Sequence, residues 1–495
     1  MTRVVPARRL RLLLDVAAAK VGVTTFRSAS GLSGKGVVIG IVDSGIETSH
    51  PSFAGRILQV WDQTMHGAGV AEGAYGAELA GPMTDLSRDT NGHGTHVAGI
   101  AAGADATFTG IAPDAELVIV KSDLLTAHIA DGVRYIFRVA ADLGRPAVVN
   151  LSLGGHYDAH DGTDSLSAAI DAAVGPGRVV CIAAGNEGND NIHAQADVRH
   201  GSSRTFACAV PRVAPGETPF EAALNGWYDG GEELAVSVVS PSHDATPPQQ
   251  VITGANPVRT YELTDGTVRL ITPGPDPANG DHNFLVEIRP TPVTPAPPAS
   301  PPSAPGTWRV KVRSSAPSST TTVRVDLWSV TEGSAQLTGR TVRDSMKVGS
   351  PGAASKAITV GSYTTRDEWE DLFGNQHASG LDVDDVSDFS SEGPRRDGVE
   401  KPDLVAPGAM IVAALSKHSG VAPAVIIDDR HRVNAGTSMA CPFAAGLVAL
   451  LLERDPTLDA DAAKEALQAA STVPGAAAGQ WDPKWGRGLI AADEL

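Results

Sequence analysis

The chain has 495 residues and a formal net charge of −18, with 42% hydrophobic and 19% charged residues. This length predicts two to three domains, and the composition excludes a disordered or collagen-like chain. The acidic balance argues against a nucleic-acid or anionic-membrane surface, because phosphate groups are bound by clustered Lys and Arg. We therefore expect the partners to be proteins or peptides.

The N-terminal residues 1–20 carry four arginines, but their apolar part, Leu12 to Leu14, is too short for the core of a signal peptide. No other stretch reaches the roughly 18 continuous apolar residues of a membrane span. The three cysteines, Cys181, Cys208 and Cys441, lack the spacing of metal ligands. Unless a leader was removed, the sequence predicts a cytoplasmic protein, or one exported without a cleavable signal.

An alternation of strands and helices is predicted for the first 200 residues. Continuous apolar runs predict buried strands at Gly36 to Val42, Leu117 to Val120, Ala147 to Leu151 and Val179 to Ala184. Helical periodicity falls between them, at Thr95 to Ala102, Ile129 to Leu143 and Ser165 to Val174. This order predicts an α/β fold with a mostly parallel central sheet flanked by helices. Chemistry is then expected at the carboxyl ends of the strands, where Asp43, Ser152 and Asn186 fall.

The middle of the chain has a different pattern. Short alternating runs punctuated by Gly, Pro and Asp-Gly predict an inserted antiparallel β-sandwich or jelly-roll module. The α/β pattern then resumes and ends with helices at Pro442 to Glu453 and Asp459 to Ala469. We therefore divide the chain into an N-terminal helix and connector (1–30), a first part of the α/β domain (31–205), the inserted module (206–345) and a second part of the α/β domain (346–495).

Three short motifs contain the residue types of a serine hydrolase. They are GIVDSGI around Asp43, NGHGTHVAG around His93 and NAGTSMACP around Ser438. A serine hydroxyl is a poor nucleophile at neutral pH, so an imidazole must take its proton. A buried carboxylate must in turn hold the imidazole in one tautomer. Asp43, His93 and Ser438 are therefore the candidate catalytic residues.

In this order the three motifs resemble those of the subtilisin-like (S8) serine peptidase family. The resemblance covers roughly residues 20–195 and 345–490, and does not include the inserted module. It implies a serine endopeptidase that hydrolyses peptide bonds in proteins through an acyl-enzyme on Ser438. It also implies that the base is His93, since His96 occupies the family's second histidine position.

The same resemblance suggests how the transition state and the substrate are held. The segment AAGNEG is similar to the family segment whose asparagine points into the oxyanion hole, which makes Asn186 a donor beside the backbone N–H of Ser438. The segment NLSLGG matches the family segment that lines the first specificity pocket and pairs with an extended substrate. The predicted substrate-binding residues are Ser152, Leu153, Gly154, Gly155, Ala183 and Gly185. Because the stretches 150–155 and 183–185 contain no charged residue, we expect an apolar or medium-sized side chain before the scissile bond.

Two other functions fit the sequence. The chain is a pseudoprotease or binding scaffold if the inserted module recognises a partner and the α/β domain only carries it. It is a peptide ligase if the acyl-enzyme is transferred to an amine. Cys181 and Cys208 are interpreted as core residues, whereas Cys441, three residues after Ser438, is either core or a thiol near the nucleophile.

No cofactor is expected in the chemistry. An acidic stretch is either a structural calcium site, as in many family members, or a solvated loop; its residues are Asp382, Asp384, Asp385 and Asp388. About 30 residues precede the first predicted strand, too few for the inhibitory propeptide common in the family. This predicts a separate inhibitory protein or an unusual export route.

Overall fold

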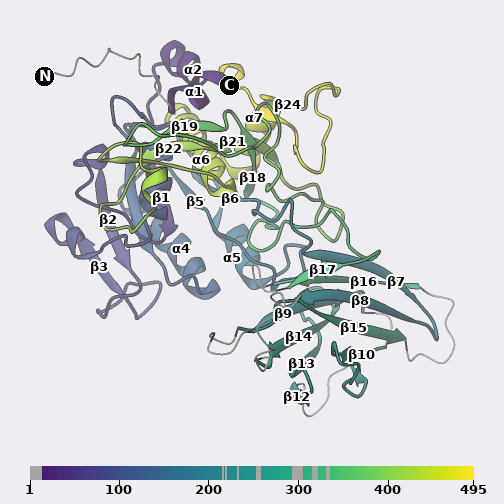
Figure 1. Cartoon of the computed structure of the whole chain (residues 1–495). Helices are drawn as coiled ribbons and strands as arrows, with labels where there is room; N and C mark the ends of the chain where they lie inside the picture. Colours follow the sequence, from purple (N-terminus) through teal and green to yellow (C-terminus); the bar gives the residue numbers. More distant parts are fainter. Residues whose placement is uncertain are drawn as a thin grey trace, which may run out of the picture.

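A computed structural model describes residues 14–213, 217, 220–230, 233–251, 258–292, 305–314, 322–330 and 335–495. It shows an α/β body at the upper left of Figure 1 and a β-sandwich at the lower right. Residues 1–13 of the predicted N-terminal segment lie outside the described residues. The rest of that segment forms two helices, α1 (Leu14–Lys20) and α2 (Val23–Ser30), which meet at Gly22 with φ 76°.

The body is built on one ten-stranded sheet with the order β24-β25-β21-β18-β6-β5-β1-β4-β2-β3. Its seven central strands from β21 to β2 are parallel to one another. Those strands are β1 (Val38–Asp43), β2 (Ile57–Asp62), β4 (Glu116–Lys121), β5 (Ala147–Leu151), β6 (Arg178–Ala183), β18 (Ile358–Thr364) and β21 (Leu404–Ala409). The edges are formed by β3 (Ala77–Ala80), β24 (Ser471–Thr472) and β25 (Leu489–Ile490). The mostly parallel sheet is thus confirmed.

Helices cover both faces of this sheet, which explains why its strands are continuously apolar. Along β1, Ile39 and Ile41 belong to the core that contains α3 (His93–Ala102), α6 (Thr437–Arg454) and α7 (Ala460–Ala469). Val38 and Val42 point the other way, into the core beneath α4 (Thr126–Asp142) and α5 (Ser165–Ala173). The helix α6 is long and apolar enough to cross a membrane, but 83% of that stretch is buried inside the fold, as in a core helix.

Smaller elements lie on the body. Two hairpin-like pairs are β19 (Glu368–Glu370) with β20 (Gln376–Ala378), and β22 (Ile411–Ala414) with β23 (His431–Asn434). Short 3-10 turns occur at Pro51–Phe53, Gly81–Leu86, Pro423–Val425 and Ala492–Glu494.

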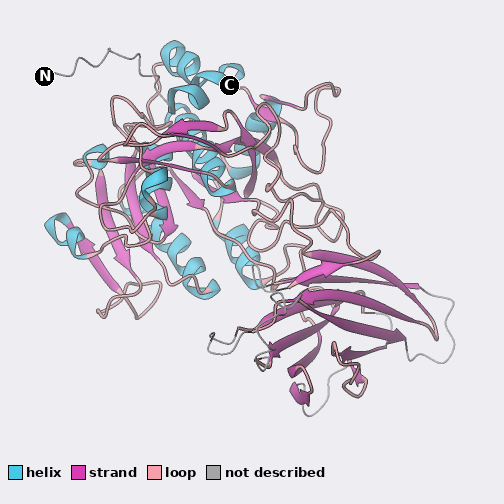
Figure 2. Cartoon of the chain, in the orientation of Figure 1, coloured by secondary structure: helices cyan, strands magenta, loops and turns pink. Residues whose placement is uncertain are grey.

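The inserted module is an antiparallel sandwich of two sheets, drawn in magenta at the lower right of Figure 2. One sheet has the order β11-β10-β15-β8-β17 and the other β12-β13-β14-β9-β16-β7. The first comprises β8 (Ser203–Val210), β10 (Leu234–Val239), β11 (Gln249–Gln250), β15 (Gly306–Ser314) and β17 (Gln336–Thr338). The second comprises β7 (His193–Arg199), β9 (Ala222–Tyr228), β12 (Val258–Leu263), β13 (Gly266–Pro275), β14 (His282–Pro290) and β16 (Thr322–Ser329).

The sandwich begins earlier in the sequence than residue 206, the predicted start of the module. Both β7 and β8 pair with its later strands, β7 with β16 and β8 with β15. Its core comes from alternating residues, as along β14, where Phe284, Val286 and Ile288 are fully buried. Polar residues alternate with apolar ones in β7, which hides it from a search for apolar runs.

Candidate active site

The carboxylate of Asp43 and the ring of His93 are in direct contact. Asp43 is the last residue of β1 and His93 the first of α3. The Nδ1 atom of His93 lies 2.8 Å from Oδ1 and 2.9 Å from Oδ2 of Asp43. Asp43 is 4% exposed, so this contact is shielded from water. The arrangement holds the proton of the ring on Nδ1 and leaves Nε2 free to accept another.

The pKa of His93 is raised above its ordinary value by this contact. Burial alone lowers the pKa of the imidazole, as does the positive charge of Arg432. The charge of Asp43, its hydrogen bond and the charge of Asp89 outweigh those effects. The carboxylate therefore both orients the ring and stabilises its protonated form.

A second aspartate, Asp89, joins the two motifs and was missed by the sequence analysis. One of its oxygens accepts from Ser44 Oγ at 2.9 Å and from the N–H of Gly92 at 2.7 Å. The other accepts from the N–H and hydroxyl of Thr95, at 2.9 and 2.6 Å. Asp89 is fully buried. It thus caps the first turn of α3 and ties the helix to the turn after β1, which sets the distance between Asp43 and His93.

Glycine at position 94 permits this close approach. A Cβ atom there would lie 2.2 Å from the carbonyl oxygen of Gly45 and 3.2 Å from Oδ1 of Asp43. Any side chain would therefore push α3 away from the end of β1. Packing against the turn after β1, above all against the carbonyl of Gly45, thus explains the glycine at position 94.

Ser438 lies in the first turn of α6, and three features fix its backbone. Pro442 has no N–H to offer to the carbonyl of Ser438, four residues earlier in the helix. That carbonyl instead accepts from Ser152 Oγ at 2.8 Å, and Ser152 is in turn held by Asn150 Nδ2 at 3.0 Å. Gly436, just before the helix, adopts φ 153° and ψ 160°, a conformation that favours glycine.

The side chain of Ser438 is in a resting position. Its Oγ atom donates to the carbonyl of Ser152 at 3.4 Å, and among the described residues no hydrogen bond joins it to His93. The helices α3 and α6 pack against each other, so His93 and Ser438 open two neighbouring helices. Hydrogen bonds between nucleophile and base are often long before substrate binds. Rotation about one side-chain bond turns the hydroxyl of Ser438 away from Ser152.

The Asn186 side chain is held beside the start of α6. Its Oδ1 accepts from the N–H of Thr437 at 2.9 Å and from the hydroxyl of Thr437 at 3.0 Å. A Cβ atom on Gly436 would lie 3.6 Å from both Asn186 Nδ2 and the nitrogen of Ser438. Two donors thus border the same small space, as an oxyanion hole requires.

Two residues near the site, His96 and Cys441, are part of the buried core. His96 is fully buried, and its Nε2 lies 3.2 Å from the carbonyls of Ile411 and Arg432. Burial lowers its pKa well below the ordinary value, so its ring stays neutral. Cys441 is also fully buried, and burial raises the pKa of its thiol well above the usual value. It belongs to the core and is not a reactive thiol.

A pocket of about 210 Å³ opens beside Ser438 and contains the predicted substrate-binding residues. Its walls include Ser152, Leu153, Gly154, Gly155, Ala183 and Gly185. Two further side chains line it that the sequence analysis did not include, His156 and Glu187. They lie immediately outside the two stretches that contain no charge. The pocket therefore contains an acidic and a basic group.

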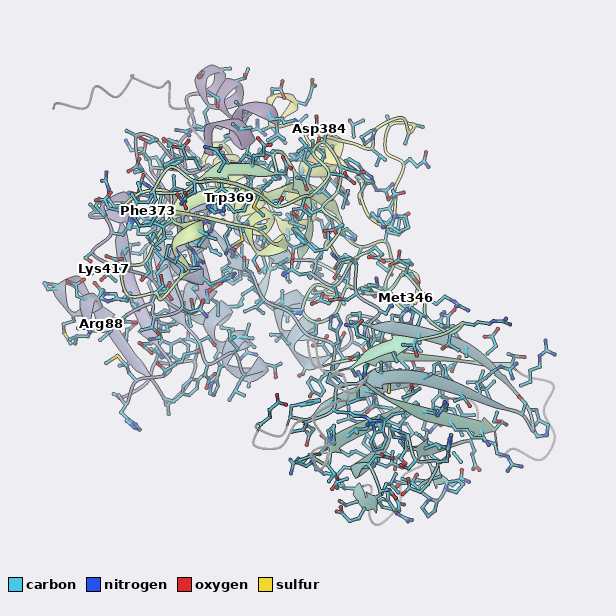
Figure 3. The ribbon with its side chains drawn as sticks, viewed as in Figure 1. Arg88, Met346, Trp369, Phe373, Asp384 and Lys417 are labelled. Carbon is cyan, nitrogen blue, oxygen red and sulfur yellow. The ribbon has the colours of Figure 1, made fainter. Side chains whose placement is uncertain are left out.

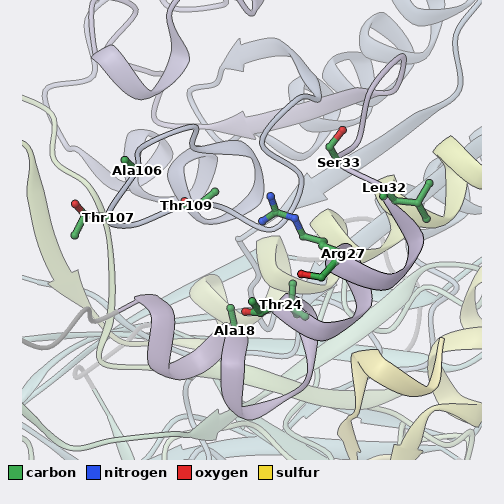
Figure 4. Close-up of a pocket in the computed structure, with 11 residues that line it drawn as sticks. Ala18, Thr24, Arg27, Leu32, Ser33, Ala106, Thr107 and Thr109 are labelled. Carbon is green, nitrogen blue, oxygen red and sulfur yellow. The ribbon is translucent and has the colours of Figure 1, made fainter.

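Another cavity, of about 410 Å³, lies between α2 and the loop at residues 106–109 (Figure 4). The guanidinium of Arg27 reaches across it and donates to the carbonyl of Gly110 at 3.2 Å. Its lining residues include Thr24 and Thr107 but none of the three candidate catalytic residues. It is not the active site.

The aspartates of the acidic stretch contact other parts of the fold. Asp384, labelled in Figure 3, is paired with Lys20 and accepts from the hydroxyl of Tyr363 at 3.2 Å. Asp388 accepts from Asn189 Nδ2 at 3.1 Å. In the described part of the chain, no three His, Cys, Asp or Glu side chains gather to hold a metal ion. These aspartates do not have the converging oxygens that calcium needs.

Comparison with known proteins agrees with this geometry. The model of the subtilase family matches residues 34–257 and 299–488, more than half of the chain. The chain belongs to the subtilase family. Membership of this family, together with relatives that are named as serine proteases, shows that this subtilase is a serine endopeptidase of the subtilisin type.

Individual relatives differ in how much of the chain they match. "Serine protease AprX" of Bacillus subtilis is 25% identical over 479 residues, which cover 93% of this chain and 67% of the relative. "Thermitase" of Thermoactinomyces vulgaris is 37% identical over 165 residues, covering 32% of this chain and 50% of the relative. The subtilase thus spans two thirds of the length of the first relative and half of the second.

A solved structure extends the likeness to the inserted module. The Clostridium perfringens CspB protease matches with a TM-score of 0.75 and covers 97% of each chain, at 23% sequence identity. This match shows a shared fold for the body and the sandwich together.

Proposed function

We propose that Ser438, His93, Asp43 and Asn186 carry out peptide-bond hydrolysis in this subtilase. The hydroxyl of Ser438 attacks the carbonyl carbon of the scissile bond while His93 Nε2 takes its proton. Asp43 keeps the ring oriented and balances the imidazolium that forms. The observation that supports this most strongly is the shielded contact between Asp43 and His93, on a helix packed against the one whose first turn contains Ser438.

The tetrahedral intermediate carries a negative oxygen. Asn186 Nδ2 and the N–H of Ser438 border the space where this oxygen sits. Collapse of the intermediate breaks the C–N bond, and His93 gives its proton to the leaving amine nitrogen. A water molecule then attacks the acyl-enzyme, again with His93 as base, and frees Ser438.

The substrate runs along the segment that follows β5. The pocket beside Ser438 takes the side chain before the scissile bond. A second hollow of about 440 Å³ shares Leu153, Gly154 and Gly155 with it and is walled by Ile129 and Leu166. The apolar part of its lining suits an apolar residue further from the scissile bond on the acyl side. His156, Asp158 and Asp164 belong to its polar part. We therefore propose that protein substrates bind in extended form across both hollows.

Hydrolysis of a peptide library by wild-type protein and by Ser438→Ala tests the proposal. We expect the substitution to lower kcat by about 10⁴-fold or more, because the covalent step is lost. Ser202→Ala, in a turn of the sandwich, is the matched control and should hydrolyse like wild type. Equal hydrolysis by wild-type protein and Ser438→Ala would contradict the proposal. Products joined to an added amine, in place of free acids, would indicate a ligase.

A further inference from the structure

The specificity pocket contains a carboxylate that faces an imidazole. Glu187 follows the oxyanion asparagine, and His156 follows the glycines of the opposite wall. His156 Nε2 lies 3.6 Å from Glu187 Oε2, and the same oxygen accepts from Ser391 Oγ at 2.8 Å. The side chain of Glu187 is 24% exposed and that of His156 is 8% exposed. The carboxylate thus reaches the pocket, while the imidazole forms part of its wall.

The hydrogen bonds around His156 place a proton on its Nδ1 and turn its Nε2 toward the carboxylate of Glu187. His160 Nδ1 lies 3.1 Å from the carbonyl of Asp158, which can only accept, so this nitrogen carries a hydrogen. Burial lowers the pKa of His160 well below the ordinary value, so its ring is neutral and its Nε2 is an acceptor. His156 Nδ1 lies 2.9 Å from that Nε2 and must donate to it. His156 Nε2 faces the carboxylate, which also accepts.

The groups that surround His156 are two carboxyl groups and a second imidazole. Glu187 stays ionised: burial raises its pKa, but the hydrogen bonds and charge of His156 and the contact with Ser391 lower it more. Asp158 lies on the same loop, and burial raises its pKa to about 7, against a smaller opposing effect of His156. His160 is neutral. An ionised carboxylate therefore faces the Nε2 atom of His156 across 3.6 Å.

The inserted sandwich holds the loop that carries His156. Asn225 in β9 donates through its Nδ2 to the carbonyls of His156 and Asp158, both at 2.9 Å. The rings of His156 and His160 are parallel with centroids 5.2 Å apart, and Trp328 of β16 stacks on His160 at 3.9 Å. The stack continues to His193 of β7, at 4.8 Å from Trp328. The position of the imidazole thus depends on side chains of the sandwich.

A linker contact fixes the far end of this stack. Trp328 Nε1 donates to the carbonyl of Met346 at 2.8 Å, and Met346 lies where the chain returns from the sandwich to the body (Figure 3). Gly349 then packs on His156, since a Cβ atom there would lie 2.9 Å from the Nδ1 atom. The loop that carries His156 is therefore held between the sandwich and the segment at Gly349.

We propose that His156 is a specificity-determining residue, positioned by the inserted sandwich, whose ring pairs with the carboxylate of Glu187 so that the primary pocket accepts uncharged side chains and discriminates against Lys and Arg. This inference rests on the proposed function. It gives a physical reason for the expected preference for uncharged side chains: the carboxylate of the pocket is already paired. Removing the imidazole leaves the carboxylate free to bind a cationic side chain.

Two peptide substrates that differ only before the scissile bond, Met or Lys, measure this directly. Met and Lys have unbranched side chains of similar length, so the ratio of their kcat/KM values reports charge. His156→Gln is expected to shift this ratio toward Lys on the order of tenfold, since the carboxylate of Glu187 is then unpaired. Glu187→Gln is expected to shift it a few-fold away from Lys, because the carboxylate that attracts a cation is then lost. The double variant should return to within about twofold of wild type.

The ratio of the two kcat/KM values is not affected by a change in the chemical step, because such a change affects both substrates equally. Folded wild-type protein that hydrolyses neither substrate and is not labelled by a fluorophosphonate speaks against the catalytic assignment. An active His156→Gln enzyme with the wild-type ratio overturns the role of His156. So does a double variant that keeps the ratio of His156→Gln, because Glu187 then is not the group that His156 pairs with.

Discussion

The α/β body and the inserted sandwich both bury apolar cores, but they place their buried polar side chains differently. In the body, Asp43, Asp89 and Asn150 lie near strand ends and helix starts and hold the reactive groups. In the sandwich, Asn225 and Asp326 are buried on the side that faces the body. Chemistry thus belongs to the body, while the sandwich contributes the shape of one pocket wall. Substitutions in the two regions should therefore affect different measured quantities.

The largest effect is expected for Asp43→Asn. The variant keeps the size of the side chain but loses the charge, and kcat should fall by about 10⁴-fold, as for carboxylates of other serine-peptidase triads. Only unprotonated His93 accepts a proton, so activity falls as the pH drops through its pKa. Asp43 raises that pKa against the effect of burial. In the variant the acidic limb of the kcat/KM profile should move to lower pH; an unmoved limb would contradict this account.

Phe206→Ala tests the sandwich by stability. Phe206 is fully buried in β8, within the core between the two sheets. Its truncation leaves a cavity, and the free energy of unfolding should fall by about 3–5 kcal/mol. Calorimetry gives the stability, and titration of active enzyme gives kcat per folded molecule. That kcat should equal the wild-type value. A fall in kcat as large as that of Asp43→Asn would show that the sandwich takes part in the chemistry, which would contradict the proposed separation of roles.

Asn186→Ala removes one oxyanion donor. We expect kcat to fall by about 10² to 10³, the range known for the corresponding loss in subtilisin itself, with little change in KM. Asn189→Ala is the matched control, because this nearby amide donates to Asp388 and does not line the pocket. Equal kcat values for the two variants would exclude Asn186 from the oxyanion hole.

Asn225→Ala should give the smallest effect, and on selectivity alone. Loss of its two hydrogen bonds to the loop loosens His156, so the Met to Lys ratio should shift a few-fold in the direction of His156→Gln. Thr260→Ala, on the exposed edge strand β12, should leave the ratio unchanged. An unchanged ratio in Asn225→Ala would mean that the sandwich does not act on the pocket.

The sequence predicted the strands of the body and the candidate triad, for identifiable reasons. Strands such as β5 and β6 are covered on both faces, so they are continuously apolar in the sequence. Asp43, His93 and Ser438 lie in short motifs whose glycines are required by local packing, as at Gly94. These strands and motifs were predictable because each depends on residues that are close together in the sequence.

Features that depend on contacts between distant segments were not predictable in this way. Asp89 is hydrogen-bonded to Ser44, and His156 faces Glu187. In each case the two residues are far apart in the sequence. The start of the sandwich was placed too late because β7 shows its pairing with β16 only in the fold. Glu187 could have been found from the sequence, because it is a charged residue directly beside a predicted pocket segment.

Labelling with a fluorophosphonate, followed by peptide mapping, tests the central claim most directly. The reagent phosphonylates a serine only when a base and an oxyanion hole activate it. We expect stoichiometric labelling of wild-type protein at Ser438 alone, and none in Ser438→Ala. A folded wild-type protein that remains unlabelled, or a label on another serine, would contradict that claim.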